Sequence, residues 1–366
     1  MTETAVIFGG PSPEHDVSVL TGLQCARALV DSGDDVACLY WSKGGDWVQV
    51  PADLEAADFA DGAPRGATPV RLVVGPGGGF SASRSLGRDR PLEVDAAIVC
   101  CHGGPGEDGT LQAVLDLAGV AYSGPSVASA ALGMDKLAFG DVVSAAGLPT
   151  LPRVALDADG DIPFDGPYIV KPRFGGSSIG IDVVEDAETA RARLNANLHL
   201  RAGAVIEPYR ADLTDLQIGI RSWPELSVSA IERPERTGSA GFYSYADKYS
   251  GGEGMASAPR ELPAKIDPST ADELRRLARR VGQLCGVRGV ARLDFLWREG
   301  ELYVNEINTV PGSLARYLWI EPAVPFLQLL RDLVDEARRR PTARYSTEGA
   351  DGRALRSAGS IAGKLG

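Results

Sequence analysis

The sequence lacks the features of membrane and secreted proteins. No run of about 18 apolar residues occurs, and no charged N-terminal segment precedes an apolar core of about 7–15 residues. We therefore expect a cytoplasmic protein with no membrane partner. Basic residues are also in deficit, with 37 Lys and Arg against 49 Asp and Glu and a net charge of −12. This balance argues against nucleic acid as a partner, so any phosphate ligand must be held by a local cluster of cations.

Cysteine is sparse and is not spaced for a metal site or a disulfide framework. The five cysteines stand at positions 25, 38, 100, 101 and 285 without a CxxC pair. Cys101 precedes His102 and could act as a nucleophile, but a buried free cysteine on a strand is the favoured interpretation.

What the chain does contain suits a loop-rich globular enzyme. It has 366 residues, of which 44% are hydrophobic, together with 44 glycines and 24 prolines. That length favours two or three domains with a substantial core.

A polar β-hairpin is predicted over residues 292–308. Apolar and polar side chains alternate from 292 to 297, as in a strand with one wetter face. Turn residues follow at 298–301, and 302–308 reads as the returning strand.

Four functional side chains share one face of this hairpin if Asp294 pairs with Glu306. Arg292 then lies opposite Asn308, and a slip of one residue would scatter the set. Two carboxylates and an amide oxygen suit Mg²⁺, which takes its remaining ligands from water and substrate phosphates. Arg292 can stabilise a developing oxyanion. The alternative is a plain polar hairpin surface.

The N-terminal part predicts strands that end in polar loops. Apolar strands are expected at 4–9, 35–41 and 94–101. Glu14 lies where a helix should begin after the first strand, and it either binds a cationic substrate group or complements the helix dipole. His102 follows the last of these strands, where α/β folds bind ligands, and is either a site residue or a loop-packing histidine.

A glycine-rich loop between two strands is the most specific feature of the middle of the chain. Strand 168–171 ends at Lys171, a Pro-Arg-Phe-Gly-Gly-Ser-Ser-Ile-Gly loop follows, and strand 181–184 returns. Glycines and the hydroxyls of Ser177 and Ser178 suit a phosphate cradle. Because the lysine precedes the glycines, we predict a flap between antiparallel strands and not a P-loop. The alternative is a flexible hairpin tip.

Several other segments contribute candidate residues. Two short helices are expected within 125–147, with Lys136 near the start of the second, where a surface lysine is the default. Strand 204–207 ends in Glu-Pro-Tyr, which can act as a hinge that reads an adenine edge. The long loop 233–262 is predicted to be a lid, and its contact residues are expected to be Tyr245, Lys248 and Tyr249.

Three helices and two further strands complete the predicted elements. Helical spacing of apolar residues marks 187–198, 268–285 and 323–339, and strands are expected at 214–220 and 226–232.

Eight stretches together resemble one family. In chain order they are FGGPSPEHDVS, HGGPGEDGTLQ, MDKL, YIVKPRFGGSSIG, VIEPY, FYSYADKY, ARLDFLW and NEINTVPG. From residue 4 to about 335 the chain resembles D-alanine–D-alanine ligases of the ATP-grasp fold. The resemblance implies an α/β chain with a Rossmann-like (pre-ATP-grasp) N-terminal domain at 1–124, a central ATP-grasp subdomain at 125–210 and a C-terminal subdomain at 211–340. Residues 341–366 lie beyond the resemblance, and their Ser, Gly, Ala and Arg content predicts a disordered tail.

The resemblance also implies a reaction and its partners. In such ligases ATP phosphorylates the carboxylate of a first D-alanine, and the amine of a second D-alanine attacks the acyl phosphate. The implied ligands are ATP, two Mg²⁺ ions, with Mn²⁺ as a substitute, and small-molecule D-amino acids. A homodimer and a role in peptidoglycan precursor synthesis are implied as well.

The family's functional residues can be carried over to matching positions. The resemblance gives phosphate and nucleotide contacts to Lys136, Lys171, Ser178, Glu207, Tyr209, Arg210 and Lys248, and metal binding to Asp294, Glu306 and Asn308. It makes Arg292 and the amide of Gly312 the oxyanion hole. Glu14 would anchor the ammonium of the first D-amino acid, linked by hydrogen bonds to Ser177 and Tyr249.

Two positions depart from the family pattern. Asp215 in LTDLQIG is the nearest candidate for the acidic residue that contacts ribose. Tyr317, followed by Leu318, stands where the family usually has a serine that binds the carboxylate of the second D-alanine. We expect His102, Arg316, Tyr317 and Leu318 to form the second-substrate pocket, reshaped by the bulk of the phenol.

Three functions are therefore weighed. The leading one is a D-alanine–D-alanine ligase or a close D-amino-acid ligase. The alternative enzyme is an ATP-grasp ligase of specialised metabolism that couples or cyclises a different D-amino-acid derivative, as Tyr317 suggests. A binding protein that has lost catalysis is the third, and the set of Lys171, Arg292 and Asp294 argues against it.

Overall fold

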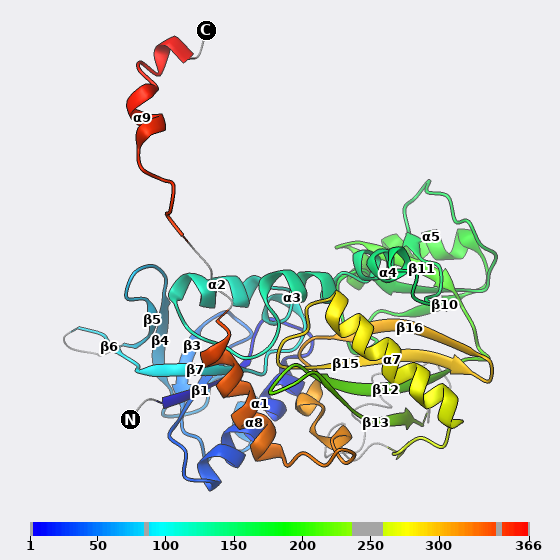
Figure 1. The fold of residues 1–366 in the computed structure, drawn as a ribbon, viewed down its shortest axis with the longest axis horizontal. Helices are drawn as coiled ribbons and strands as arrows, with labels where there is room; N and C mark the ends of the chain where they lie inside the picture. Colours follow the sequence, from blue (N-terminus) through cyan, green and yellow to red (C-terminus); the bar gives the residue numbers. More distant parts are fainter. Residues whose placement is uncertain (1–2, 84–87, 236–258, 342–345, 365–366) are drawn as a thin grey trace.

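The computed structural model describes residues 3–83, 88–235, 259–341 and 346–364, which form three β-sheets flanked by helices (Figure 1). The expected lid residues Tyr245, Lys248 and Tyr249 lie outside the described residues. In the described part of the chain, none of the helices combines the length and the apolar character that a membrane span needs.

The N-terminal sheet is built around β1, which runs parallel to both of its neighbours, β2 and β7. Antiparallel strands extend this sheet beyond β2. Its strands in spatial order are β6 (Arg90–Pro91), β5 (Gly79–Ala82), β4 (Thr68–Val73), β3 (Trp47–Val50), β2 (Val36–Trp41), β1 (Glu3–Gly9) and β7 (Val94–Val99). The three strands predicted from sequence are confirmed. Because β1 and β7 are parallel, the loops that carry Glu14 and His102 leave the same edge of the sheet.

Helices cover both faces of the N-terminal sheet. They are α1 (His15–Asp31), α2 (Thr110–Ala118) and, from the far end of the chain, α8 (Phe326–Arg339). Leu329, Leu330 and Leu333 of α8 are buried in one cluster with Val6 and Phe8 of β1. The expected C-terminal subdomain at 211–340 thus includes a helix that packs on the N-terminal sheet (Figure 1).

The central sheet is small and antiparallel. Its order is β10 (Asp182–Val184), β9 (Tyr168–Pro172), β11 (Ala204–Pro208) and β8 (Val154–Ala155). Helix α5 (Ala187–Ala196) and the 3-10 turn η3 (Leu198–Leu200) pack against it. The antiparallel pairing of β9 with β10 confirms that the glycine-rich segment joins two antiparallel strands.

The third sheet carries the predicted hairpin. Its order is β14 (Arg260–Glu261), β13 (Ser227–Pro234), β12 (Thr214–Arg221), β15 (Val290–Arg298) and β16 (Glu301–Asn308). Helix α7 (Pro268–Leu284) buries Leu274 and Leu277 against one face. Helices α3 (Val127–Met134) and α4 (Lys136–Ala145) lead from the N-terminal part to this sheet. The opposite face of β12, β15 and β16 is left for polar side chains.

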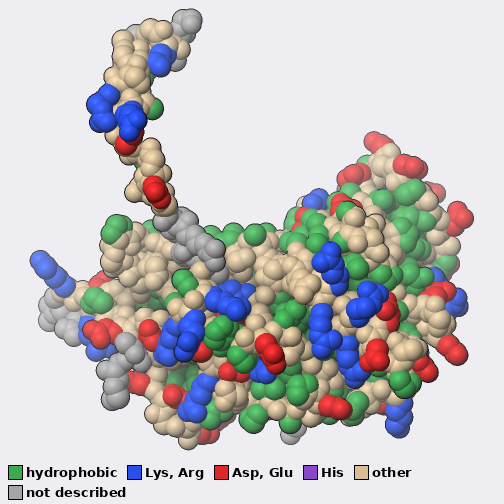
Figure 2. Space-filling view, in the orientation of Figure 1, with side chains coloured by type: hydrophobic (Ala, Val, Ile, Leu, Met, Phe, Trp, Pro, Cys, Tyr) green, Lys and Arg blue, Asp and Glu red, His purple; other side chains and the backbone are tan. Residues whose placement is uncertain are grey.

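The surface and the tail add little to the site. Figure 2 shows basic side chains interspersed with acidic ones over α7 and α8, and ion pairs such as Arg276–Glu273 and Arg339–Asp335 account for part of this mixture. The tail at 341–366 was expected to be disordered. The structure gives it a five-residue helix, α9 (Arg353–Ser357), none of whose residues is buried and which stands away from the body (Figure 1).

Candidate active site

The β15–β16 hairpin has the register that the sequence predicted. Asp294 pairs with Glu306 and Arg292 with Asn308, so all four side chains share one face. Gly300 makes the turn with a φ of 80°, a left-handed conformation that favours glycine.

A β-bulge interrupts the ladder next to this set. Asp294 pairs with Glu306 whereas Phe295 pairs with Val304, so Asn305 is an extra residue on β16. The Asn305 side chain reaches Lys171, with Oδ1 at 3.4 Å from Nζ. In a regular strand the consecutive side chains of Asn305 and Glu306 would point to opposite faces. Because of the bulge, they instead reach Lys171 and Lys136, respectively.

Arg292 and Asp294 form a buried bidentate pair. Nε and Nη2 of Arg292 donate to the two carboxylate oxygens at 2.7 and 2.8 Å, and both residues are about 5% exposed. Asn308 Nδ2 also donates to Asp294, at 3.3 Å. Burial alone would lower the pKa of Arg292, but Asp294 outweighs it and raises that pKa well above its usual value. The guanidinium is thus a fixed positive charge in the site.

Lys171 belongs to a buried charge cluster at the end of β9. Its Nζ donates to Glu207 Oε2 at 2.8 Å, and Arg153 Nε lies 3.4 Å from the other carboxylate oxygen. Burial would raise the pKa of Glu207, but the two cations hold it below its usual range. Arg153 also donates to the backbone carbonyls of Lys136 and Asn305, at 2.9 and 3.0 Å. Glu207 is therefore an ion-pair partner of the expected phosphate lysine.

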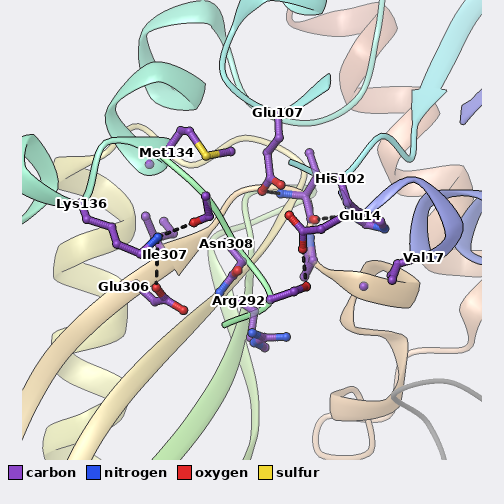
Figure 3. A pocket seen from close by; sticks show the side chains of 17 residues that line it. Glu14, Val17, His102, Glu107, Met134, Lys136, Arg292, Glu306, Ile307 and Asn308 are labelled. Carbon is purple, nitrogen blue, oxygen red and sulfur yellow. Dashed lines mark hydrogen bonds and ion pairs between the residues drawn. The ribbon is translucent and has the colours of Figure 1, made fainter. Parts of the chain in front are cut away.

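Lys136 is buried and points into the site, which excludes the default of a surface lysine. Asp135 caps α4 through the N–H groups of Leu137 and Ala138 and fixes where the helix begins. Lys136 Nζ donates to the carbonyl of Gly175 in the flap and lies 3.7 Å from Glu306 (Figure 3). The lysine thus links α4, the flap and the hairpin.

Two serines and one glycine give the flap its left-handed backbone, and the glycine is Gly180, with a φ of 78°. Ser177 and Ser178 have left-handed φ values of 51° and 59°. Gly176 lies so close to Glu14 that an added Cβ would come within 2.6 Å of its carboxylate. Ser177 Oγ donates a hydrogen bond to Glu14 Oε1. The flap is therefore closed onto the start of α1.

Glu14 and His102 face each other across the N-terminal edge of the site (Figure 3). Glu14 occupies the N-cap position of α1, yet its side chain makes no capping hydrogen bond and reaches the pocket instead. His102 is buried, and burial lowers its pKa. Its Nδ1 lies 2.7 Å from the carbonyl of Val310 and its Nε2 lies 2.8 Å from the Thr21 hydroxyl. A neutral ring fits this arrangement when Nδ1–H donates to Val310 and Nε2 accepts from Thr21.

Glu107 is a pocket residue that sequence reasoning missed. One carboxylate oxygen accepts from the N–H of Gly103 at 2.9 Å, and the other accepts from the N–H of Val310 at 2.9 Å. Burial raises the pKa of Glu107 to about 7, and the nearby Glu14 adds to the effect. The signal that could have found it is its position in the same strand-end loop as His102.

The pocket between these elements is lined by residues from every part of the fold. They are Glu14, Val17, His102, Glu107, Gly133, Met134, Lys136, Gly175, Gly176, Ser177, Arg292, Glu306, Ile307, Asn308, Val310, Pro311 and Gly312. Eight of the expected site residues thus line one pocket: Glu14, His102, Lys136, Ser177, Arg292, Glu306, Asn308 and Gly312. Lys171 contacts Asn305, the chain neighbour of Glu306. Cys101 takes no part: it is buried, and burial raises its thiol pKa to about 12, as expected for a structural cysteine.

The expected adenine and ribose residues Tyr209, Arg210 and Asp215 do not line this pocket and form contacts within the protein. The Tyr209 N–H donates to the carbonyl of Pro167 at 2.7 Å, and Arg210 forms ion pairs with Asp212 and Glu301. Asp215 lies on β12 opposite Leu296.

Three of the four expected second-substrate residues, Arg316, Tyr317 and Leu318, fall on η5 (Gly312–Leu318), whereas His102 lies in the loop after β7. Leu318 is buried, whereas Arg316 is exposed and stacks on Phe326 with 5.3 Å between the guanidinium carbon and the ring centre. Tyr317 points back over the third sheet, where Arg292 is one of the charges that influence it.

The donor set on the hairpin fits a hard divalent cation. Asp294, Glu306 and Asn308 offer carboxylate and amide oxygens on one face, the ligands that Mg²⁺ prefers. Within the described ranges, no three His, Cys, Asp or Glu side chains gather into a metal-binding group, so substrate phosphates and water would have to complete the shell.

Comparisons with known proteins match both the N-terminal and the C-terminal part of the chain to one family. Family models described as "D-ala D-ala ligase N-terminus" and "D-ala D-ala ligase C-terminus" match residues 3–125 and 161–335. A D-alanine–D-alanine ligase of Bradyrhizobium sp. (strain ORS 278) is 33% identical over 352 residues, which cover 92% of this chain and 95% of that protein. One from Mycolicibacterium smegmatis is 32% identical over 370 residues, with 93% and 96% covered.

Solved structures show the same fold. The D-alanine-D-alanine ligase from Coxiella burnetii superposes with a TM-score of 0.74 at 21% identity, covering 93% of this chain and 94% of that one. The VanG D-Ala:D-Ser ligase from Enterococcus faecalis gives 0.72 at 25% identity, covering 92% and 99%.

Proposed function

Because the chain belongs to the D-alanine–D-alanine ligase family, we propose that it is an ATP-dependent, ADP-forming ligase that joins two D-amino acids. The observation that carries the proposal is the meeting of Lys136, the flap and Glu306 around one pocket with Arg292 and Glu14. This arrangement combines phosphate-binding cations with a fixed charge at the reacting centre, as a phosphoryl transfer followed by an acyl transfer requires.

The first step activates a carboxylate. A carboxylate oxygen of the first D-amino acid attacks the γ-phosphorus of ATP, the bond to the β-phosphate oxygen breaks, and ADP leaves. Lys136 and Lys171 hold the phosphates, and the Ser177–Ser178 flap encloses them. Glu14 holds the ammonium of this substrate, which its position beside Ser177 supports.

The second step forms the amide. The amine nitrogen of the second substrate bonds to the acyl carbon, the negative charge moves to the carbonyl oxygen, and phosphate then leaves with the electrons of the broken C–O bond while the nitrogen loses a proton. Arg292 and the N–H of Gly312 stabilise the oxyanion. Asp294 accepts two hydrogen bonds from Arg292 and so fixes the direction of the guanidinium.

A divalent cation would be held by Asp294, Glu306 and Asn308. When bound, it supplies charge neutralisation between the transferring phosphate groups. Two Mg²⁺ ions are proposed, and Mn²⁺ is expected to substitute because it accepts the same oxygen ligands.

We also propose roles for individual residues. They are nucleotide contacts by Ser178, Glu207, Tyr209, Arg210, Asp215 and Lys248, a hydrogen bond from Tyr249 toward Glu14, and a second-substrate pocket of His102, Arg316, Tyr317 and Leu318. Action in the cytoplasm as a homodimer, with a product used for peptidoglycan precursors, is proposed by analogy with the family.

Phosphate release from ATP tests the proposal directly. With D-alanine, ATP and Mg²⁺ the protein is expected to release phosphate and to form a D-alanyl dipeptide that mass spectrometry identifies. L-Alanine serves as the matched control and should give neither. The proposal is overturned if D-alanine is not turned over, either alone or mixed with other D-amino acids.

A second candidate function is favoured by one observation. Tyr317 is a bulky phenol on η5, the segment proposed to contact the second substrate. The alternative is therefore an ATP-grasp ligase of specialised metabolism that couples or cyclises a different D-amino-acid derivative. Product masses from a mixture of D-amino acids separate the two candidates.

A further inference from the structure

A second group of polar side chains lies on the third sheet beyond Arg292, away from the pocket. We call it the Glu232 cluster, and it consists of Gln217 on β12, Glu232 on β13, Arg260 on β14 and Tyr317 on η5. Glu232 pairs with Gln217 and Gln217 pairs with Asp294, so these side chains share one face of the sheet. Glu306 continues the same row. The cluster therefore extends the polar row of the active site by two strands.

Charge and stacking hold this cluster together. Glu232 is 1% exposed, and its Oε1 lies 3.0 Å from Arg260 Nη1. The Arg260 guanidinium lies 4.4 Å from the centre of the Tyr317 ring. Burial raises the pKa of Glu232 to about 7, against the lowering effects of Arg260 and Arg292. Burial, reinforced by Glu232, also raises the pKa of Tyr317, so the phenol stays protonated.

Three buried oxygen atoms of the cluster lack hydrogen-bond partners among the described residues. They are Glu232 Oε2, Gln217 Oε1 and the Tyr317 hydroxyl oxygen. Buried polar atoms in folded proteins are nearly always paired, and each exception calls for an explanation. All three oxygens can accept a hydrogen bond, and the carboxylate and amide oxygens can do nothing else when Glu232 is ionised. A ligand that completes the cluster must therefore supply donors.

We propose that the Glu232 cluster recognises a hydrogen-bond-donating group on the side chain of the second substrate. The inference rests on the proposed function and names the class of that substrate: a D-amino acid whose side chain carries an ammonium or a carboxamide. The donor group binds Glu232 Oε2 and the Tyr317 oxygen, while the reacting amine lies near Arg292 and Gly312. The bond changes remain those of amide formation from the acyl phosphate.

D-Alanine would complete this site poorly. Its methyl group has no donor, so the three oxygens would stay unpaired beside it. Sites built to hydrogen-bond a substrate group discriminate strongly against an analogue that lacks the group, because their own polar atoms then lose a partner.

Competition between second substrates tests the inference. ATP and D-alanine are supplied with equimolar D-2,4-diaminobutyrate, D-asparagine or D-2-aminobutyrate, and the dipeptides are quantified by mass spectrometry. The mixed product of the ammonium or carboxamide substrate is expected to exceed D-alanyl-D-alanine by at least about tenfold. D-2-Aminobutyrate, which is apolar, should show no such advantage. The two donor-bearing arms separate an ammonium from a carboxamide, and equal yields in all arms overturn the inference.

Two variants locate the preference. Tyr317→Phe removes only the hydroxyl, and Glu232→Gln replaces one carboxylate oxygen with a donor. Both are expected to lower the ratio of the mixed dipeptide to D-alanyl-D-alanine, toward the ratio obtained with D-2-aminobutyrate. Glu225→Gln, the same change at an exposed position between β12 and β13, is the matched control and should leave the ratio unchanged. If Tyr317→Phe and Glu232→Gln fold and both retain the wild-type ratio, the cluster does not select the substrate.

The outcomes separate the inference from the proposed function. Absence of phosphate release with every amine contradicts the proposed function. Formation of D-alanyl dipeptides without any preference contradicts only the role of the Glu232 cluster.

Discussion

At the scale of single residues, the site depends on charges that are buried in pairs. Arg292 with Asp294 and Lys171 with Glu207 each place a cation and a carboxylate within 2.8 Å in nearly complete burial. Such pairs contribute little net stability but become costly when one partner is lost. Their benefit here is orientation, because a paired guanidinium keeps its direction before substrate arrives.

Replacing Arg292 with lysine should distinguish the contribution of its positive charge to kcat from that of its hydrogen-bond geometry. Lysine keeps the positive charge but loses the two parallel bonds to Asp294, so kcat is expected to fall by about 10²–10³-fold. Nucleotide binding, measured by calorimetry, should persist. Arg298→Lys, an exposed change on the same strand, is the control and should leave kcat near the wild-type value. An unchanged kcat for Arg292→Lys would remove Arg292 from the oxyanion site.

Glu232 predicts a pH dependence of stability. Its pKa is about 7 in the folded protein, raised by burial from 4.5. A raised folded-state pKa means that the stabilisation from the protonated form is complete below pH 4.5 and is lost as pH rises toward 7. The free energy of unfolding of Glu232→Gln, measured relative to that of the wild type, should therefore increase by up to about 3 kcal/mol from pH 4 to pH 8.

Thermal unfolding midpoints across that pH range measure the effect. Glu225→Gln provides the exposed comparison and should run parallel to the wild type. A constant difference between Glu232→Gln and wild type at every pH would show that Glu232 ionises normally.

At the scale of elements, the sequence predicted the hairpin register but not the bulge within it. Alternation of apolar and polar residues fixes which face each side chain takes, and that periodicity is visible in residues 292–297. The extra residue Asn305 has no compositional signature, because its position is set by contacts with Lys171 and Arg153 that lie far away in sequence. Arg153 itself was missed for the same reason.

The flap illustrates a second limit of sequence reasoning. Glycines were expected to provide the unusual backbone, and Gly180 does so with a φ of 78°. Ser177 and Ser178 also have left-handed φ values, whereas Gly176 is needed because Glu14 approaches it. Glycine permits both a positive φ and a close approach, and sequence alone does not say which one a position uses.

Alanine substitutions in the flap should therefore differ at adjacent positions. A Cβ at residue 176 would lie 2.6 Å from Glu14 Oε2, whereas one at residue 175 would be no nearer than 3.4 Å to Pro172. Gly176→Ala is expected to lower kcat/KM for the first amino acid by about 10²-fold, because it displaces Glu14. Gly175→Ala is the matched control with a small effect. Steady-state kinetics measure both, and equal effects would contradict the close approach.

At the scale of the whole molecule, the site is assembled by contacts between distant segments. His102 and Glu107 of the N-terminal part bind the backbone at Val310, and Thr21 accepts from the N–H of Ser313. Arg153 connects the start of α4, the bulge of β16 and Glu207 on β11.

Loss of Arg153 should weaken the molecule and its nucleotide site together. Arg153→Met removes one of the two cations on buried Glu207 and two bonds to backbone carbonyls, so unfolding is expected to become easier by roughly 3 kcal/mol. ATP affinity should fall as well, because Glu207, the partner of Lys171, loses the second cation that helps to hold it in place. Arg201→Met, at an exposed position before β11, is the control. Thermal unfolding and nucleotide titration measure the two effects, and the same small change in both variants would exclude a bridging role.

The segment after Gly312 contains three successive left-handed residues, Ser313, Leu314 and Ala315, with φ values near 50°. L-residues adopt this conformation at a cost of about 1–2 kcal/mol each, and here it is maintained by the burial of Leu314 and Ala315 in the core shared by α1 and α8. Local preference would return this turn to a right-handed path as soon as that core opened. Loss of activity on heating should therefore coincide with loss of tertiary structure, with no inactive yet folded form in between.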